Sequence, residues 1–281
     1  MNPDPLVAPP KLGDYVELTK PRLSLLSVLT ALVGYYASRP EPDAWKLGTV
    51  LLGTSLAAGG VASLNQWMER DTDTQMKRTA DRPIPAGKVP DGSAFVLGML
   101  MCIAALFLLF ARVLGWYTPA KRWSRWSTEI GALAGAFPPL IGWAAGEGRV
   151  TALGWILFGL LFFWQVPHFM AVAWTYRRDY SAVHFPMLPV LDASGVWVAR
   201  WSFLNTLLLV GVSVLPTVLG LASLYYAAAA AAAGAWFLWR AARFLRPAGR
   251  DAAARQLFLA SIGYLPLVLI ALVTDRLVFV P

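Results

Sequence analysis

Long apolar stretches separated by short charged segments fill this chain from residue 22 almost to its end. A helix needs about 20 mostly apolar residues to cross the hydrocarbon of a bilayer. The pattern therefore predicts an all-α fold, a polytopic transmembrane helical bundle that forms a single membrane domain over residues 1–281. The clear spans are expected at residues 22–38, 47–68, 92–111, 129–145, 151–175, 197–219, 221–239 and 256–274.

The number of crossings depends on residues 91–120. About 30 residues make roughly 45 Å of helix, whereas two crossings need about 60 Å. Lys and Arg gather on the cytoplasmic side of membrane proteins. If residues 91–120 form a short hairpin with Arg112 near its turn, nineteen of the 24 Lys and Arg fall on one side. A single crossing would leave ten on that side, so we expect about nine spans, the third and fourth unusually short.

Composition excludes a water-soluble globule, because 57% of the residues are apolar, 14% are charged and the mean hydropathy is +0.55. The net charge is +8, and the basic residues lie between the spans. We therefore expect contacts with membrane lipid and no nucleic-acid partner. The N-terminal segment has neither a signal-peptide pattern nor an Arg-rich targeting helix. These features favour a bacterial plasma (inner) membrane, with the tail at 1–21 and the loops at 69–91 and 176–196 in the cytoplasm.

Residues with carboxylate or amide side chains lie at the end of the second span and just after it. Asn65, Glu69 and Asp73 are spaced by four, so a continuing helix would place them on one face. Carboxylate and amide oxygens suit Mg²⁺, which often shares its shell with phosphate. Cationic side chains for phosphate oxygens follow at Lys77, Arg78 and Arg82. The pattern predicts a site for a Mg²⁺-bound diphosphate, and the alternative is a solvated loop whose charges pair with one another.

A second polar group lies in and after the span at 151–175. His168 is deep in the apolar stretch with Gln165 three residues before it, and Asp179 lies about 16 Å further along if one regular helix continues. Polar groups inside a span are costly and mark function or a hydrogen bond between helices. Both interpretations stay open for His168, and His184 is left unassigned.

These residues are part of longer motifs. Asn65 to Gly87, with Arg82-Pro-Ile-Pro-Ala-Gly87 at its end, resembles the first acidic motif of the UbiA-type intramembrane prenyltransferases. Three further motifs resemble those of the heme-farnesylating branch of that family: Tyr117-Thr-Pro-Ala-Lys121-Arg122, Trp164-Gln-Val-Pro-His168-Phe and Pro186-Met-Leu-Pro189-Val. The resemblance covers most of the chain, from about residue 15 to the last span.

The resemblance implies a nine-helix bundle that transfers the farnesyl group of farnesyl diphosphate to a vinyl group of heme B, a substrate, giving heme O. It implies that Asn65, Glu69, Asp73 and Asp179 bind Mg²⁺, and that His168 and Gln165 lie in the heme region. The diphosphate would be bound by Lys77, Arg78, Arg82, Tyr117, Lys121, Arg122 and Tyr176. The family's pathway adds heme A synthase as a candidate partner.

Three departures from the family pattern stand out. Glu69 replaces the usual Asp, the second acidic motif is reduced to Asp179, and the segment before Tyr117 is short for two helices. Two alternatives remain besides heme farnesylation. One is prenylation of an aromatic quinone precursor, and the other is a heme-binding membrane protein without catalysis, which would need His168 but not Asp73.

Overall fold

The computed structural model describes residues 9–38, 43–109, 127–182 and 186–279. Within these ranges the regular structure is helical, and no strand occurs. The helices are α1 (Leu12–Leu18), α2 (Pro21–Ala37), α3 (Ala44–Asp73), α4 (Asp91–Leu109), α6 (Ser127–Gly135), α7 (Phe137–Glu147), α8 (Ala152–Thr175), α9 (Arg177–Ala182), α10 (Leu188–Leu191), α11 (Val196–Val218), α12 (Leu224–Phe244) and α13 (Arg250–Val278). The predicted all-α class is confirmed.

Four of these helices, α3, α8, α11 and α13, are long and apolar enough to cross a bilayer by themselves. A shorter apolar helix covers Asp91–Ala105 within α4. Large apolar side chains such as Leu26, Leu100, Trp155 and Ile270 are exposed on the outside of the bundle, where lipid would cover them. The protein is therefore an integral membrane protein.

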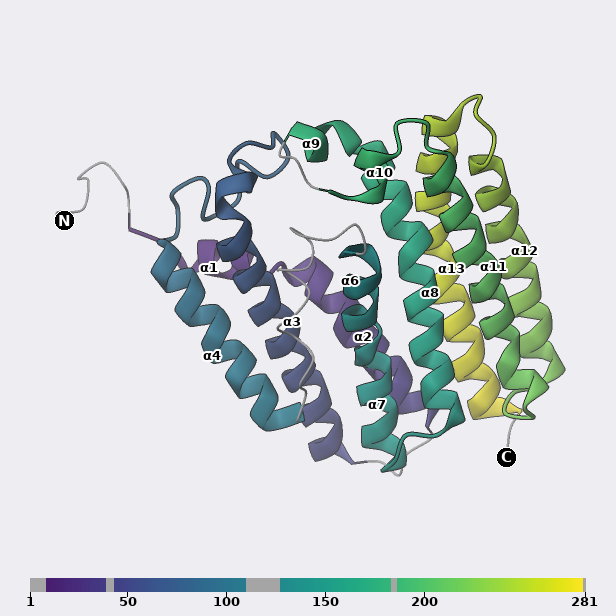
Figure 1. Ribbon diagram of the computed structural model, residues 1–281. Helices are drawn as coiled ribbons and strands as arrows, with labels where there is room; N and C mark the ends of the chain where they lie inside the picture. The colour runs from purple at the N-terminus through teal and green to yellow at the C-terminus, as the bar shows by residue number, and fades with distance from the viewer. Residues whose placement is uncertain (1–8, 39–42, 110–126, 183–185, 280–281) are drawn as a thin grey trace.

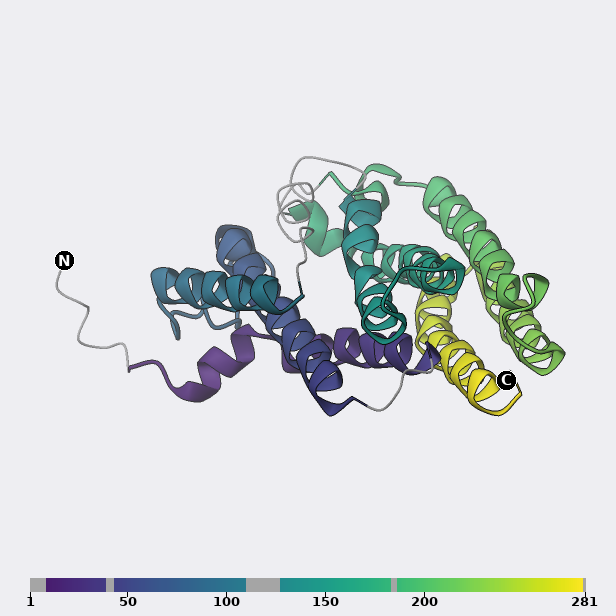
Figure 2. The same ribbon diagram turned by 90° about the horizontal axis from the view of Figure 1, so that it is seen from below.

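The helices form two groups joined by α2 and α7 (Figure 1). On one side α3 packs against α4, and on the other α8, α11, α12 and α13 pack against one another. Helix α2 contacts α3 and α13 as well as α7, so it connects the two groups (Figure 2). Most of the buried apolar core lies in the α8–α13 group, around residues such as Leu157, Phe237 and Tyr264.

Glycines allow the closest helix contacts. A Cβ added to Gly142 of α7 would overlap the carbonyl oxygen of Ala31 in α2, and one added to Gly34 of α2 would overlap that of Pro139 in α7. Small residues are how membrane helices bring their backbones close, because dispersion contacts replace the hydrophobic effect there. The α2–α7 pair is thus a closely packed joint between the two helix groups.

Two expectations about helix continuity were wrong. The span expected at 129–145 is broken at Ala136 into α6 and α7, where Pro138 and Pro139 supply no backbone N–H for a continuous helix. The helix that carries His168 stops at Thr175, and Asp179 lies on the separate short helix α9. Asp179 is therefore not simply about three turns beyond His168 along the same helix axis.

The predicted hairpin falls partly outside the described residues. Helix α4 runs without interruption from Asp91 to Leu109, and its end lies at the opposite end of the bundle from the start of α6 (Figure 1). Residues 110–126, with Arg112, Tyr117, Lys121 and Arg122, lie outside the described ranges. The expected count of nine spans remains a prediction.

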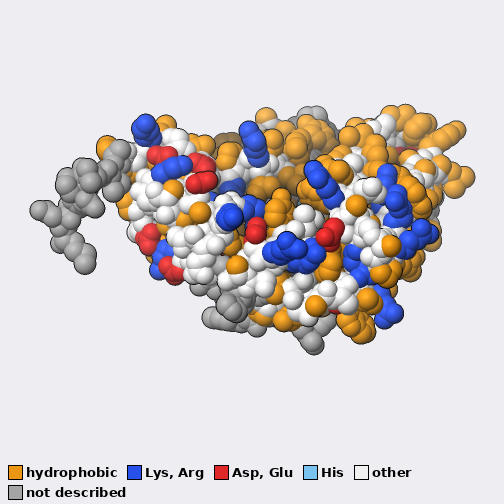
Figure 3. Space-filling model, turned by 90° about the horizontal axis from the view of Figure 1, so that it is seen from above, with side chains coloured by type: hydrophobic (Ala, Val, Ile, Leu, Met, Phe, Trp, Pro, Cys, Tyr) orange, Lys and Arg blue, Asp and Glu red, His pale blue; other side chains and the backbone are white. Residues whose placement is uncertain are grey.

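The polar loops meet at one end of the bundle. The connections after α3, after α8 and after α12 all lie at the upper end in Figure 1. Seen from that end, Lys and Arg side chains gather on the surface with acidic side chains among them (Figure 3). The two acidic motifs therefore lie at the same end of the bundle.

Candidate functional site

The site begins on the last two turns of α3. The helix continues to Asp73, so Asn65, Glu69 and Asp73 lie on one face, as the spacing predicts. The Asn65 Nδ2 donates to Glu69 Oε2 at 2.9 Å. Glu69 is 2% exposed and Asp73 is fully buried, although both are carboxylates near the end of α3. Buried carboxylates need a cation or hydrogen-bond donors to stay ionised.

Arg82 supplies that cation. Its Nη1 lies 2.5 Å from Asp73 Oδ2 and 3.8 Å from Glu69 Oε2. Asp73 Oδ1 is also buried, and it has no hydrogen-bond partner in the described structure. One carboxylate oxygen of Asp73 is thus paired with Arg82, and the other is available to a further ligand.

The loop at residues 74–90 brings Arg82 back to α3. Thr79 Oγ1 donates to the carbonyl oxygen of Asp73 at 3.0 Å, which fixes the first turn after the helix. Further along, Gly87 adopts a positive φ of 70°, which suits a residue without a Cβ, and allows the chain to turn toward α4. The side chains of Ile84 and Val89 are buried against Leu18 of α1. The loop is a packed structure and not a solvated tail.

Arg78 connects this loop to the second motif. Its Nη2 donates to Tyr180 Oη at 3.1 Å, and its guanidinium lies 5.2 Å from the ring centroid of Tyr176. Met76 and Tyr180 also belong to one buried apolar cluster with Met187. These contacts join residues that are about a hundred positions apart in the sequence, so the structure brings the two motif loops together.

The predicted site residues are not all gathered equally. Asn65, Glu69, Asp73 and Arg82 form one cluster. Arg78, on the same loop as Arg82, contacts Tyr176, and Lys77 is exposed. Asp179 is half-buried on α9 next to Tyr180. Among the described residues, no group of three or more His, Cys, Asp and Glu is arranged to bind a metal ion. A metal here would need the Asn65 amide, the two α3 carboxylates and ligands from a substrate.

The donor set still fits Mg²⁺. The ion prefers oxygen ligands and commonly keeps waters and one or two carboxylates in its shell together with substrate phosphates. The buried, unpartnered Oδ1 of Asp73 is a hard oxygen ligand of this kind. Two carboxylates and an amide on one helix face supply part of such a shell.

A second set of polar side chains lies between α8 and its neighbours. Gln165 Nε2 donates to the carbonyl oxygens of Ala132 and Leu161 at 3.3 and 3.2 Å, so this amide is used in contacts with α6 and with its own helix. His168 Nδ1 lies 2.7 Å from Ser261 Oγ of α13. The interhelical hydrogen bond considered for His168 therefore exists.

The surroundings of Ser261 favour one tautomer of His168. The Ser261 hydroxyl lies 2.5 Å from the carbonyl oxygen of Phe258, and a hydroxyl that donates its single proton there has only acceptor capacity left. In that arrangement the Ser261 oxygen accepts from an Nδ1–H of His168, and Nε2 keeps its lone pair. The His168 ring stacks on Trp164 with centroids 4.8 Å apart, which fixes its orientation. Sequence reasoning missed Ser261, since a serine in an apolar span gives no signal of such a partner.

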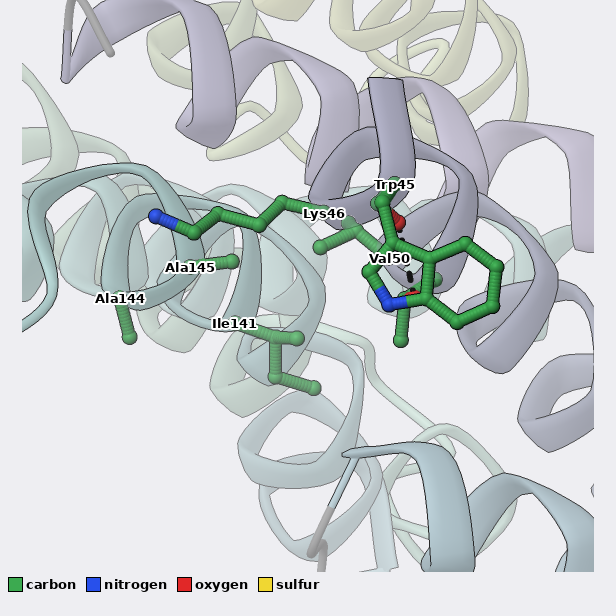
Figure 4. A pocket seen from close by; sticks show the side chains of 7 residues that line it. Trp45, Lys46, Val50, Ile141, Ala144 and Ala145 are labelled. Carbon is green, nitrogen blue, oxygen red and sulfur yellow. Dashed lines mark hydrogen bonds between the residues drawn. The ribbon is translucent and has the colours of Figure 1, made fainter. Parts of the chain in front are cut away.

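A hollow elsewhere in the molecule belongs to no predicted motif. It has a volume of about 480 Å³ and lies between the start of α3 and the end of α7, at the end of the bundle opposite the acidic residues. Trp45 and Lys46 stand at its rim, above Val50, Ile141, Ala144 and Ala145 (Figure 4). Its lining has no carboxylate or imidazole, so it is not part of the site.

Comparison with known proteins finds relatives along nearly the whole chain. Residues 27–262 match the model of the UbiA prenyltransferase family. The chain is 70% identical to a protoheme IX farnesyltransferase of Opitutus terrae, over 96% of this chain and 97% of that protein. It is 37% identical to the protoheme IX farnesyltransferase of Solibacter usitatus, over 94% of this chain and 99% of the relative.

Solved structures share the fold at low sequence identity. A digeranylgeranylglyceryl phosphate synthase superposes with a TM-score of 0.80 at 18% identity, covering 94% of this chain and 98% of that one. A UbiA homolog from Archaeoglobus fulgidus bound to GPP and Mg²⁺ superposes with a TM-score of 0.62 at 12% identity, covering 92% of this chain and 99% of the homolog. These structures support the helical architecture in which the two loops meet.

Proposed function

Because this chain belongs to the UbiA prenyltransferase family, we propose that it transfers the farnesyl group of farnesyl diphosphate to a vinyl group of heme B, forming heme O. The relative that is 70% identical over nearly the full length carries the name of this activity. The likeness extends along the chain and is not confined to the acidic motif, which favours heme over an aromatic quinone precursor as the acceptor.

One observation carries the proposal. Two buried carboxylates on α3 lie within reach of Arg82, at the end of the bundle where Arg78 joins the second motif. Such a pairing of anionic and cationic groups suits a divalent cation that is bound together with a diphosphate. When bound, Mg²⁺ would neutralise charge on the departing diphosphate and so favour cleavage of the C–O bond to the farnesyl carbon.

The residues around this site have distinct roles in the proposed reaction. Asn65, Glu69 and Asp73 would bind the metal, with Asp179 completing the set from the second motif. Arg78 and Arg82 would bind diphosphate oxygens, and Lys77, Tyr176 and the loop residues Tyr117, Lys121 and Arg122 remain candidates for the same task. Mg²⁺ is bound in the Archaeoglobus fulgidus homolog, and we extend this requirement to the present chain.

The apolar bundle would protect the reaction from water. The vinyl carbon of heme B attacks the farnesyl carbon that loses the diphosphate, and a water then adds to the resulting cation and releases a proton. An early encounter with bulk water would hydrolyse the allylic cation. The aromatic side chains of Trp164, Phe169 and Phe258 around His168 provide an apolar environment in the membrane interior.

His168 is the residue that we assign to heme. A histidine that binds a metal usually donates its other ring N–H to a fixed acceptor, which orients the ring. His168 has this arrangement through Ser261, with Nε2 left for the heme iron. Gln165, which packs against α6, would support the same region without contacting the iron.

The proposed function implies a place in the cell. We propose the bacterial inner membrane, with the N-terminus and both acidic loops on the cytoplasmic side, because most Lys and Arg lie with those loops. Farnesyl diphosphate could then keep its chain in lipid and its diphosphate at the cytoplasmic end. An association with heme A synthase remains a prediction from the family's pathway.

The direct test is a mass-spectrometric assay for heme O with the purified protein, heme B, farnesyl diphosphate and Mg²⁺. Asp73→Asn should lower the rate of heme O formation at least about a hundredfold, since it removes a negatively charged ligand of the metal ion. Asp71→Asn is the matched control, because Asp71 is exposed on a different face of the same helix. Retained heme binding without any product would instead support a heme-binding protein that lacks catalysis.

A further inference from the structure

Arg82 pairs with a carboxylate oxygen, Asp73 Oδ2, that lies on the same carboxylate as the oxygen available to a metal ion. Its Nη1 is 2.5 Å from Asp73 Oδ2 and 3.8 Å from Glu69 Oε2, so one guanidinium nitrogen faces both carboxylates of the α3 face. The guanidinium is held there by a folded loop, in which the Arg82 backbone N–H donates to the Thr79 carbonyl at 3.1 Å and Thr79 in turn is bonded to Asp73.

Two cations cannot share this place at close range. A divalent ion bound to Asp73 Oδ2 would lie within a few ångströms of the guanidinium, and like charges repel strongly where little water screens them. Removing Arg82 without a replacement is equally unfavourable, because Asp73 is fully buried and an uncompensated buried charge is costly. Any exchange of the two cations therefore has to be concerted.

We propose that Arg82 is a built-in substitute cation that competes with Mg²⁺ for Asp73 and leaves it only when a diphosphate offers Arg82 another anionic partner. The inference rests on the proposed function, in which the α3 carboxylates bind Mg²⁺. It adds a condition to that function: the metal ion and the diphosphate bind together, and neither binds tightly alone. The side chain is 21% exposed, which leaves the guanidinium a path toward the mouth of the site.

This arrangement predicts a coupling between two ligands. Diphosphate takes Arg82 away from Asp73 and so raises the affinity for Mg²⁺, and by linkage Mg²⁺ raises the affinity for diphosphate by the same factor. The coupling would keep the carboxylates paired between turnovers and would disfavour binding of a divalent ion that does not bring a diphosphate with it.

The test uses Mn²⁺ as the probe, because free aqueous Mn²⁺ gives an EPR signal that disappears on binding. The affinity of the purified full chain for Mn²⁺ is measured without any diphosphate. Arg82→Gln should bind Mn²⁺ about tenfold more tightly than the wild type, or tighter still, within the usual range of coupling between ligands. A residue that merely helps to build the site would weaken binding when it is replaced.

Two controls separate the explanations. Arg70→Gln also removes one positive charge near the end of α3, but Arg70 pairs with Asp91 at 2.9 Å, so Mn²⁺ affinity should not change. Asp73→Asn combined with Arg82→Gln should abolish the tight binding. If that double variant still bound Mn²⁺ tightly, the metal would lie elsewhere and the proposed site itself would be wrong.

The outcome that overturns the inference is a folded Arg82→Gln, judged by near-UV circular dichroism and size-exclusion chromatography, whose Mn²⁺ affinity equals or falls below that of the wild type. If the Gln variant does not fold, Arg82→Lys serves instead. A lysine ammonium has a shorter reach and no planar fork to span two carboxylates, so Mn²⁺ should bind a few-fold more tightly. An unchanged affinity in the Lys variant would equally contradict the substitution of one cation by the other.

Discussion

Arg78 Nη2 donates a hydrogen bond to Tyr180 Oη at 3.1 Å, across 102 positions of the sequence. The same guanidinium lies over the rings of Tyr176 and Tyr180, at 5.2 and 5.7 Å from their centroids. One cation on the first motif loop is thus held by two aromatic residues that flank Asp179 of the second. The contact provides a direct link between the acidic motifs.

This link predicts different effects for its two ends. Tyr180→Phe keeps the ring but removes a hydrogen bond to a charged group, so KM for farnesyl diphosphate should rise by roughly tenfold. Arg78→Gln should raise it further, since it also removes the charge that binds the diphosphate. Steady-state kinetics measure both, with Tyr225→Phe, an exposed tyrosine at the start of α12, as the control. An unaltered KM in Tyr180→Phe would show that the link has no role in binding.

His168 and Ser261 give a prediction for heme. Ser261→Ala removes the acceptor of the His168 Nδ1–H, so heme B should bind about tenfold more weakly. In reduced heme the iron–histidine stretch, recorded by resonance Raman spectroscopy, should move to lower frequency, and Ser261→Thr should restore it. His168→Ala should abolish that band.

The control for this pair is Ser202→Ala. Ser202 is as deeply buried in α11 and its hydroxyl bonds only its own helix, to Val198 O at 2.8 Å. Its replacement should leave heme binding and the Raman band unchanged. A band that persists in His168→Ala would assign the iron to another ligand.

The environment of Asp192, in the connection between α10 and α11, makes the stability of the protein depend on pH. Burial alone would raise the pKa of its carboxyl, but hydrogen bonds from Ser194, Val198, Trp197 and Gly195 outweigh burial and lower the pKa below its usual value. A lowered pKa means that the carboxylate stabilises the fold above the unfolded-state pKa, and that this contribution is lost as pH falls through the folded-state pKa. Thermal stability should therefore fall toward acidic pH.

The matching variant is Asp192→Asn. It should be less stable than the wild type at neutral pH, and the difference should shrink at acidic pH, as measured by thermal unfolding in detergent. Asp81→Asn is the comparison, because Asp81 is exposed. A pH-independent difference between Asp192→Asn and the wild type would mean that the carboxylate charge contributes nothing to the α10–α11 connection.

Gly142 predicts the cost of separating α2 from α7. A Cβ at this position overlaps the backbone of Ala31, which cannot move aside as a side chain could. Gly142→Ala should lower the free energy of unfolding by about 1–3 kcal/mol, the usual cost of overpacking. Gly211→Ala on α11, where nothing lies within 4 Å of the added carbon, should be neutral or slightly stabilising. Equal thermal unfolding of the two variants would contradict a tight α2–α7 joint.

Much of the fold could be predicted because lipid imposes simple rules. Apolar length marks helices such as α3, α8, α11 and α13, since a backbone in hydrocarbon must satisfy its own hydrogen bonds. The break at Ala136 was missed because hydropathy measures apolar character and ignores the missing N–H groups of the two prolines that follow. The span at 151–175 was predicted almost to the residue, but the start of the separate helix α9 at Arg177 was not, because hydropathy contains no information about the direction of the chain after a span.

The helical class and the shared face of Asn65, Glu69 and Asp73 follow from the sequence, because the helix repeat places residues four apart on one side. The return of Arg82 to Asp73, the contact between Arg78 and Tyr180 and the contact between Ser261 and the His168 ring depend on tertiary packing. Each of these contacts joins separate elements, through a loop reversal or helix packing. Such geometry depends on how all the helices fit together, and local periodicity contains no information about it.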